Sequence, residues 1–188
     1  TPPGASTSIL SWSDSAVWDS SSGQLLFLGT PAGSTTPWKL AIYRESDNTW
    51  REGSQPPSLG LGHGSDHNAI DPLTGTFYFR RYSTETVSFY PITQDPTISQ
   101  GLWGSLPQIG IVNFVGPAGA LEYFPELNGL IYVENGEVHY YNKISGQWTN
   151  LALGLAMGGS QNFASYNPVH GGVVFGGGGN NNIYQLDS

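Results

Sequence analysis

The chain of 188 residues contains no cysteine, and it has only six basic residues against fourteen acidic ones, a net charge of −8. The absence of cysteine excludes disulfide bonds, thiolate nucleophiles and cysteine-ligated zinc. Without a basic surface, we expect no nucleic-acid partner and no attraction to an anionic membrane. No apolar run approaches the roughly 20 residues that span a bilayer, so no membrane insertion is predicted.

Helical periodicity is also absent over any stretch longer than about ten residues. Charged residues make up only 11% of the chain, whereas it contains 26 glycines, 13 prolines and 13% aromatic residues. This composition is typical of an all-β protein with short strands and many turns, and it argues against disorder. Because the chain begins with Thr1 rather than methionine, we expect a processed, truncated or fragmentary product.

Four segments of the sequence share one pattern, in which a small residue and a short strand precede a turn, a glycine and an apolar run. They are AVWDSSSGQLLFLG from Ala16, AIDPLTGTFYFR from Ala69, ALEYFPELNGLIYV from Ala120 and ASYNPVHGGVVFGG from Ala164. Their glycines, Gly23, Gly75, Gly129 and Gly172, are 52, 54 and 43 residues apart. Regular spacing of this length indicates repeated units of four strands each.

A tyrosine followed by a tryptophan marks the second half of the first three units. The pairs are Tyr43 with Trp50, Tyr90 with Trp103 and Tyr141 with Trp148. Asn135-Gly136, between two strand-like runs, predicts a two-residue hairpin. The approximate units are 9–56, 57–107, 108–153 and 154–188, and we expect them to form a single domain over residues 1–188.

In these features the sequence resembles the kelch and galactose-oxidase-type β-propellers. The resemblance implies an all-β propeller of about four four-stranded blades, either a small ring or part of a larger propeller. It departs from the family pattern in two ways: a double glycine on the second strand is clear only at Gly176–Gly179, and the fourth unit stops before any tryptophan. The copper chemistry of galactose oxidase uses a cofactor built with cysteine, so this chain excludes it, and no cofactor is predicted.

The histidines of HGSDH at residues 63–67 are the first candidates for a metal site. His63 and His67 are four residues apart, but Gly60, Gly62 and Gly64 prevent the helix on which such a pair binds zinc. A loop-built site stays open as an alternative, although we expect no tightly bound transition metal.

The start of each inner strand offers a better candidate site, because in a propeller these positions meet at the rim of the central channel. The predicted ligand-binding residues there are Asp14, Asp66, His67, Gln161 and Asn162, with Trp12 as an adjacent ring. Polar groups that converge on a concavity are what ligand recognition requires. The alternative is a solvated rim that binds only water.

The aromatic residues divide into repeated and unrepeated ones. Trp50, Trp103 and Trp148 recur at one position of each unit, so we expect them to pack between blades rather than to stack on sugars. The unrepeated residues, better candidates for ligand contact, are Trp12, Trp18, Trp38 and Tyr82.

Three functions are compatible with this reading. The favoured one is a non-catalytic binding or structural module that recognises a glycan or protein through its rim loops, at an extracellular or virion surface. The second is an assembly scaffold of a filament or virion appendage, which would self-associate through edge strands. The third is a carbohydrate-active enzyme that uses rim carboxylates such as Asp14 and Asp66, which no motif supports.

Overall fold

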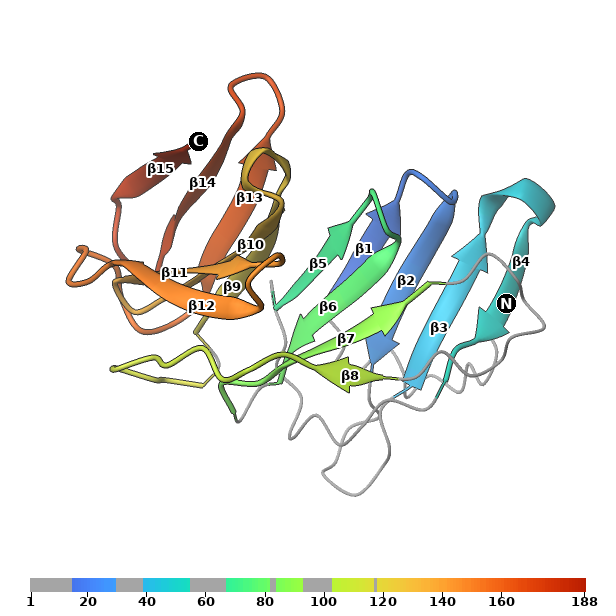
Figure 1. Cartoon of the computed structure of the whole chain (residues 1–188), viewed down its shortest axis with the longest axis horizontal. Coiled ribbons are helices and arrows are strands. Elements are labelled where there is room, and N and C mark those ends of the chain that lie inside the picture. The colour runs from blue at the N-terminus through green and yellow to red at the C-terminus, as the bar shows by residue number, and fades with distance from the viewer. Residues whose placement is uncertain (1–14, 30–38, 55–66, 82–83, 93–102, 117) are drawn as a thin grey trace.

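The computed structural model describes residues 15–29, 39–54, 67–81, 84–92, 103–116 and 118–188. Within these ranges the chain forms four antiparallel sheets and no α-helix (Figure 1). Two short 3-10 turns, η1 (Glu45–Asp47) and η2 (Pro125–Leu127), join neighbouring strands. The prediction of an all-β propeller with about four blades is confirmed.

Each blade is a sheet of consecutive strands in chain order. The first contains β1 (Ser15–Asp19), β2 (Gln24–Gly29), β3 (Lys39–Arg44) and β4 (Thr49–Glu52). The second contains β5 (Asn68–Asp71), β6 (Thr76–Arg80), β7 (Val87–Pro91) and β8 (Gly104–Ser105). The third contains β9 (Ala120–Phe124), β10 (Gly129–Glu134), β11 (Glu137–Asn142) and β12 (Gln147–Ala152). The fourth contains β13 (Asn162–Asn167), β14 (Gly172–Gly177) and β15 (Ile183–Asp187).

The first strand of every blade lies on the inner side, and β1, β5, β9 and β13 lie next to one another in that order. The side-chain amide of Asn68 on β5 donates to the carbonyl of Ala16 on β1 at 3.3 Å. The backbone N–H of Tyr166 on β13 donates to the carboxylate of Glu122 on β9 at 3.1 Å. Polar side chains of the inner strands therefore bridge adjacent blades.

The turn from the first to the second strand repeats in all four blades, with a left-handed residue four positions after the end of the inner strand. These residues and their φ angles are Gly23 (63°), Gly75 (62°), Asn128 (46°) and Gly171 (62°). Glycine and asparagine are the residues that adopt this conformation at least cost. In three blades the inner strand ends in Asp19, Asp71 or Asn167, whose side chain accepts a backbone N–H two residues on.

Aligned by this turn, the alanines that mark the four repeats are not all equivalent. The hairpin registers place Ala16, Asn68, Leu121 and Ala164 at the same position. The expected equivalence of the four alanines is therefore wrong for Ala69 and Ala120, which are offset by one residue. An offset of one moves a side chain to the other face of its strand.

The tyrosine–tryptophan pairs form the same contact in three blades. The ring centroids of Tyr43 and Trp50, of Tyr90 and Trp103, and of Tyr141 and Trp148 are each 5.2 Å apart. In two blades the indole N–H also donates to a backbone carbonyl just after the last strand of the preceding blade. Trp103 donates to the carbonyl of Ser54 at 3.2 Å, and Trp148 donates to that of Pro107 at 3.1 Å. The prediction that these tryptophans have a packing role is consistent with both contacts.

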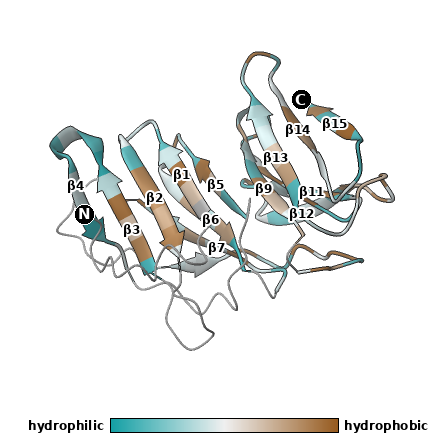
Figure 2. Cartoon of the chain, turned by 180° about the vertical axis from the view of Figure 1, so that it is seen from behind, coloured by the Kyte–Doolittle hydropathy of each residue, from teal (hydrophilic) through white to brown (hydrophobic). Residues whose placement is uncertain are grey.

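The hydrophobic core lies between blades, where buried apolar residues of one sheet cluster with those of the next. Figure 2 shows hydrophobic residues along β2 and β3, the central strands of the first blade. Leu26 and Ile42 of the first blade pack with Phe77 of the second. Tyr78 of the second blade packs in a cluster with Leu130 of the third, and Ile131 of the third in a cluster with Phe175 of the fourth. Among the described residues, each blade therefore buries its faces against its neighbours, as repeat architectures do.

Candidate ligand site

Residues of the four inner strands line a cavity of about 220 Å³, which we call the axial cavity. Its lining residues are Ala16, Val17, Asn68, Ala69, Ile70, Leu121, Glu122 and Ala164. Three alanines leave the space open, and Glu122 carries the one charge among the described residues of the lining. Ligand pockets for drug-sized molecules measure roughly 300–1,000 Å³, so this cavity suits a single small ring or one residue of a longer ligand.

Glu122 and Asn68 give the axial cavity its polar character. The carboxylate of Glu122 accepts the backbone N–H of Tyr123 on Oε1 at 2.8 Å and that of Tyr166 on Oε2 at 3.1 Å. Each oxygen thus has an internal donor, which fixes the orientation of the group, and a carboxylate has about four acceptor positions. Asn68 is held by the hydrogen bond that its side-chain amide donates to Ala16, and among the described residues nothing donates to its amide oxygen, which is an acceptor. Acceptor oxygens and a negative charge favour hydroxyl groups or a cation over an anion.

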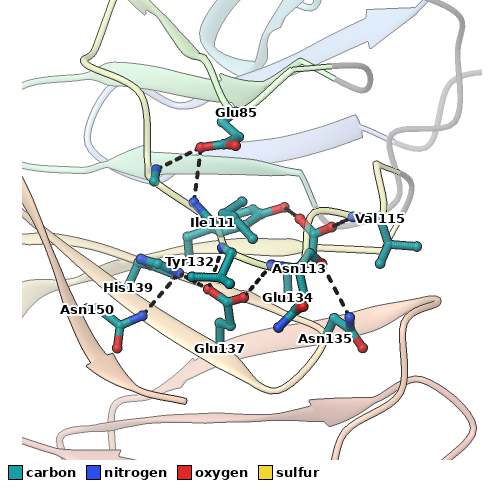
Figure 3. A network of polar contacts seen from close by, with 12 residues as sticks. Glu85, Ile111, Asn113, Val115, Tyr132, Glu134, Asn135, Glu137, His139 and Asn150 are labelled. Atoms are coloured by element: carbon teal, nitrogen blue, oxygen red, sulfur yellow. Dashed lines mark hydrogen bonds and ion pairs between the residues drawn. The ribbon is translucent and has the colours of Figure 1, made fainter. Parts of the chain in front are cut away.

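A second polar arrangement lies where the chain passes from the second blade to the third (Figure 3). Residues 110–116, which we call the strap, are held by the carboxylates of Glu85, Glu134 and Glu137. Glu85 accepts the N–H groups of residues 110 and 111, Glu137 those of 112 and 113, and Glu134 those of 115 and 116. Each glutamate thus binds two backbone donors of the strap.

Glu134 and Glu137 have no unoccupied carboxylate oxygen. The second oxygen of Glu134 accepts the hydroxyl of Tyr132 at 2.6 Å, and that of Glu137 lies 3.0 Å from Nε2 of His139. Burial alone would raise the pKa of Glu137, but the N–H groups of the strap and His139 outweigh it, so the pKa lies below its ordinary value. A carboxylate held ionised by internal donors is a structural anchor rather than a general acid.

Arg80 connects the strap to His67, which precedes the inner strand of the second blade. Its guanidinium donates to the carbonyl of Gly116 and lies 2.8 Å from Nε2 of His67. It also stands 5.4 Å from the ring centroids of both Phe114 and Tyr132. Burial first, and the Arg80 charge second, hold the pKa of His67 well below its ordinary value, so the imidazole is neutral.

The structure separates the predicted rim residues into three groups. His67 and Asn162 are 0% and 2% exposed, so they do not face an open channel as expected. The Asn162 amide instead accepts the N–H of Asn135 at 3.1 Å and donates to the carbonyl of Gly158 at 3.1 Å. Gln161 is exposed and has a left-handed φ of 50°. Asp14, Asp66 and Trp12 lie outside the described residues, and ligand binding by the rim stays a prediction.

The metal and aromatic predictions also fall partly outside the described residues. His63, Trp38 and Tyr82 lie there, whereas Trp18 on β1 is 43% exposed. No group of three or more histidine, aspartate or glutamate side chains that could hold a metal ion occurs in the part of the chain that the structure covers. In that same part, no helix is long and apolar enough to cross a membrane.

Sequence reasoning missed Glu122 and the strap. Glu122 stands in an apolar inner strand, ALEYF, where an isolated charge was a detectable signal of an internal or ligand contact. The strap had a signal too: Glu134-Asn-Gly-Glu137 places two acidic residues around one hairpin turn in a chain with few charges. Neither signal repeats in the other units, so a search for repeated positions does not find it.

No known protein family matches the sequence, and no curated protein is significantly similar to it. Solved structures do resemble the fold. An auxiliary nutrient binding protein from Bacteroides ovatus has a TM-score of 0.62 and 15% identity, over 94% of this chain and 39% of that one. TolB from Acinetobacter baumannii has a TM-score of 0.56 and 10% identity, over 92% and 40% of the two chains.

A mutant of NanB sialidase from Streptococcus pneumoniae has a TM-score of 0.53 and 17% identity, over 85% of this chain and 26% of that one. The chain therefore spans less than half the length of each of these three proteins. Identities this low carry the fold and not the activity. The chain shares the β-propeller type of fold with these structures.

Proposed function

We propose that the chain is a non-catalytic binding module that takes a neutral glycan, one sugar ring at a time, in the axial cavity. The observation that carries the proposal is the convergence of Asn68 and Glu122 on a cavity otherwise walled by small and apolar side chains. Sugar hydroxyls pair with carboxylate and amide oxygens, while an apolar wall accepts the face of the ring. The net charge of −8 favours a neutral or cationic ligand over an anionic one.

Two further observations support this reading. The nutrient binding proteins from Bacteroides ovatus and Bacteroides thetaiotaomicron are named for binding and share the fold, with TM-scores of 0.62 and 0.53. In the network around the strap, Glu134 and Glu137 are occupied by internal donors and so offer no acid–base pair. The three equal tyrosine–tryptophan contacts support a kelch-like origin of the blades. We place the protein at an extracellular or virion surface.

Calorimetric titration with a panel of neutral and acidic mono- and oligosaccharides tests the proposal. We expect neutral sugars to bind and acidic sugars not to. Glu122→Gln, which removes the charge, and Ala16→Leu, which fills the cavity from an exposed position, are expected to weaken binding at least tenfold. Glu52→Gln is the matched control, because Glu52 lies on the outer strand of the first blade, away from the axial cavity.

The rim prediction is tested in the same titration. Asp66→Ala is expected to weaken glycan binding without changing the melting temperature, and the wild-type protein is expected to turn over none of the sugars it binds. A panel that gives no heat with the wild-type protein, or equal affinity in Ala16→Leu, removes the carbohydrate assignment.

An assembly scaffold is the second candidate, and one observation favours it. β15 pairs with β14 and has no second partner strand among the described residues, so it presents a sheet edge. Unpaired edges add strands from other chains. Light scattering distinguishes the two functions, because a scaffold is expected to associate with increasing concentration whereas a binding module stays monomeric.

A further inference from the structure

The strap differs from an ordinary surface loop in the direction its polar groups face. A surface loop commonly solvates its backbone and exposes polar side chains. In the strap, six backbone N–H groups point to the carboxylates of Glu85, Glu134 and Glu137, so the backbone is turned toward the protein. The strap therefore turns its polar backbone groups toward the protein, whereas an ordinary surface loop turns them toward solvent.

Four neighbouring residues of the strap, 112–115, are exposed, and three of them are apolar, the fourth being Asn113. Val112 is 73% exposed, Val115 is 40% exposed and Phe114 is 36% exposed, whereas Ile111 in the same segment is buried at 7%. Exposed apolar side chains on neighbouring positions gain nothing in water, and such patches mark interaction surfaces when they are held together. Residues 112–115 form this patch.

The patch is held in one conformation before any partner arrives. The side-chain amide of Asn135 donates to the carbonyl of Asn113 at 3.3 Å, and Arg80 lies 5.4 Å from the ring centroid of Phe114. A preformed loop loses little conformational entropy on binding, which raises affinity for a given contact area. Because the three glutamates fix the backbone of the strap, its apolar side chains are already positioned for contact with a partner.

We propose that residues 112–115 dock a protein partner whose contact surface combines apolar and cationic side chains. The apolar part is required by Val112, Phe114 and Val115. The cationic part follows from charge: the chain carries −8, and the three carboxylates that hold the strap outnumber Arg80, the cation that lies against Phe114. The same charge disfavours a second copy of this chain as the occupant. The patch shares no residue with the axial cavity, so it is independent of the proposed glycan site.

Two matched sets of synthetic 12-residue peptides test this proposal by fluorescence polarisation with the full chain. Both sets have the same leucine and phenylalanine positions, and one carries lysine and arginine where the other carries glutamate and aspartate. We expect members of the cationic set to bind, with affinity that falls as salt rises, and the acidic set not to bind. Val112→Ser is expected to weaken binding at least fivefold.

Val169→Ser is the matched control, because Val169 is 82% exposed on a turn between β13 and β14 and loses the same side chain. It is expected to bind like the wild type, and the melting temperatures of both variants are expected to match that of the wild type. Glu137→Gln tests the preformed loop: hydrogen exchange at residues 112 and 113 should rise together with a weaker peptide affinity.

Four results of the peptide experiments would overturn the proposal. They are no binding by the cationic set, equal or tighter binding by the acidic set, equal loss of affinity in Val112→Ser and Val169→Ser, or faster exchange in Glu137→Gln with unchanged affinity. Concentration-dependent dimerisation that Val112→Ser abolishes would assign the patch to a second copy instead, and would also overturn the proposed partner class.

Discussion

Nη2 of Arg80 lies 2.8 Å from Nε2 of His67, and neither side chain has any exposed surface. The imidazole accepts a hydrogen bond from the guanidinium, so it cannot take up a proton in the folded state without losing that bond. Burial and the Arg80 charge both hold the pKa of His67 well below 6.5.

This pair predicts a loss of stability in mild acid. The unfolded chain protonates His67 near pH 6.5 while the folded chain does not, so the unfolded state binds more protons and stability falls as the pH drops below that value. The slope approaches about 1.36 kcal/mol per pH unit below pH 6.5, for as long as the folded chain keeps His67 neutral. His67→Gln, which keeps an acceptor for Arg80, is expected to remove this part of the slope in urea unfolding.

His170→Gln is the control for the acid prediction, since His170 is exposed on a turn. It is expected to keep the wild-type pH dependence. Equal losses between pH 7 and 5 in the wild type and in His67→Gln would contradict the prediction.

Glu137→Ala tests the anchoring of the strap. The change leaves the N–H groups of Val112 and Asn113 and the ring of His139 without their acceptor, and we expect a loss of about 3 kcal/mol in the free energy of unfolding at pH 7. Because the folded-state pKa of Glu137 is lowered, its contribution is present above about pH 4.3 and is lost as the pH falls through the folded-state value. The difference in the free energy of unfolding between the wild type and Glu137→Ala should therefore become smaller in acid.

Trp148 should contribute to the free energy of unfolding in two ways that two variants separate. Trp148→Phe keeps a ring against Tyr141 but loses the indole N–H bond to Pro107, at an expected cost of about 1 kcal/mol. Trp148→Ala also loses the ring, and the cost should rise to about 3 kcal/mol. Trp18→Ala, at a 43% exposed position, should cost less than Trp148→Ala in urea unfolding. Equal costs would mean that the repeated tryptophans are not structural.

Gln161→Gly separates strain from binding. Gln161 has φ of 50°, a conformation that costs residues other than glycine about 1 kcal/mol, so glycine is expected to raise the melting temperature slightly. If the Gln161 side chain contacts a ligand at the rim, the same variant should bind glycan more weakly while being more stable. Unchanged affinity together with raised stability would remove Gln161 from the predicted rim site.

The sequence predicts the repeated parts of this fold well. The tyrosine–tryptophan spacing identifies pairs that the structure brings to a common 5.2 Å contact, and Asn135-Gly136 forms the expected tight hairpin with positive φ at both residues. These features are local, because each depends on residues close in the chain. The single-residue offset of Ala69 and Ala120 was not predictable in this way, since alanine fits either face of an inner strand.

The candidate sites were harder to predict because they depend on contacts between blades. The polarity of His67 and its place before an inner strand predict a rim contact, but no pattern in the sequence indicates that Arg80, thirteen residues on, folds over it. The backbone N–H of Tyr166, 44 residues away, helps to orient Glu122. The conformation of the strap likewise depends on glutamates of two different blades. Contacts of this range follow from the arrangement of the sheets and from no pattern within a unit.

The nearest-neighbour burial of the blades has a consequence for cooperativity. Each sheet is built from consecutive strands and, within the described ranges, shares its core with the adjacent sheets, so folding can spread from one blade to the next in the manner of a one-dimensional chain. A defect in the third blade should therefore propagate to the second and fourth before it reaches the first. Native-state hydrogen exchange of Trp148→Ala should show this gradient, with protection in β2 and β3 lost last.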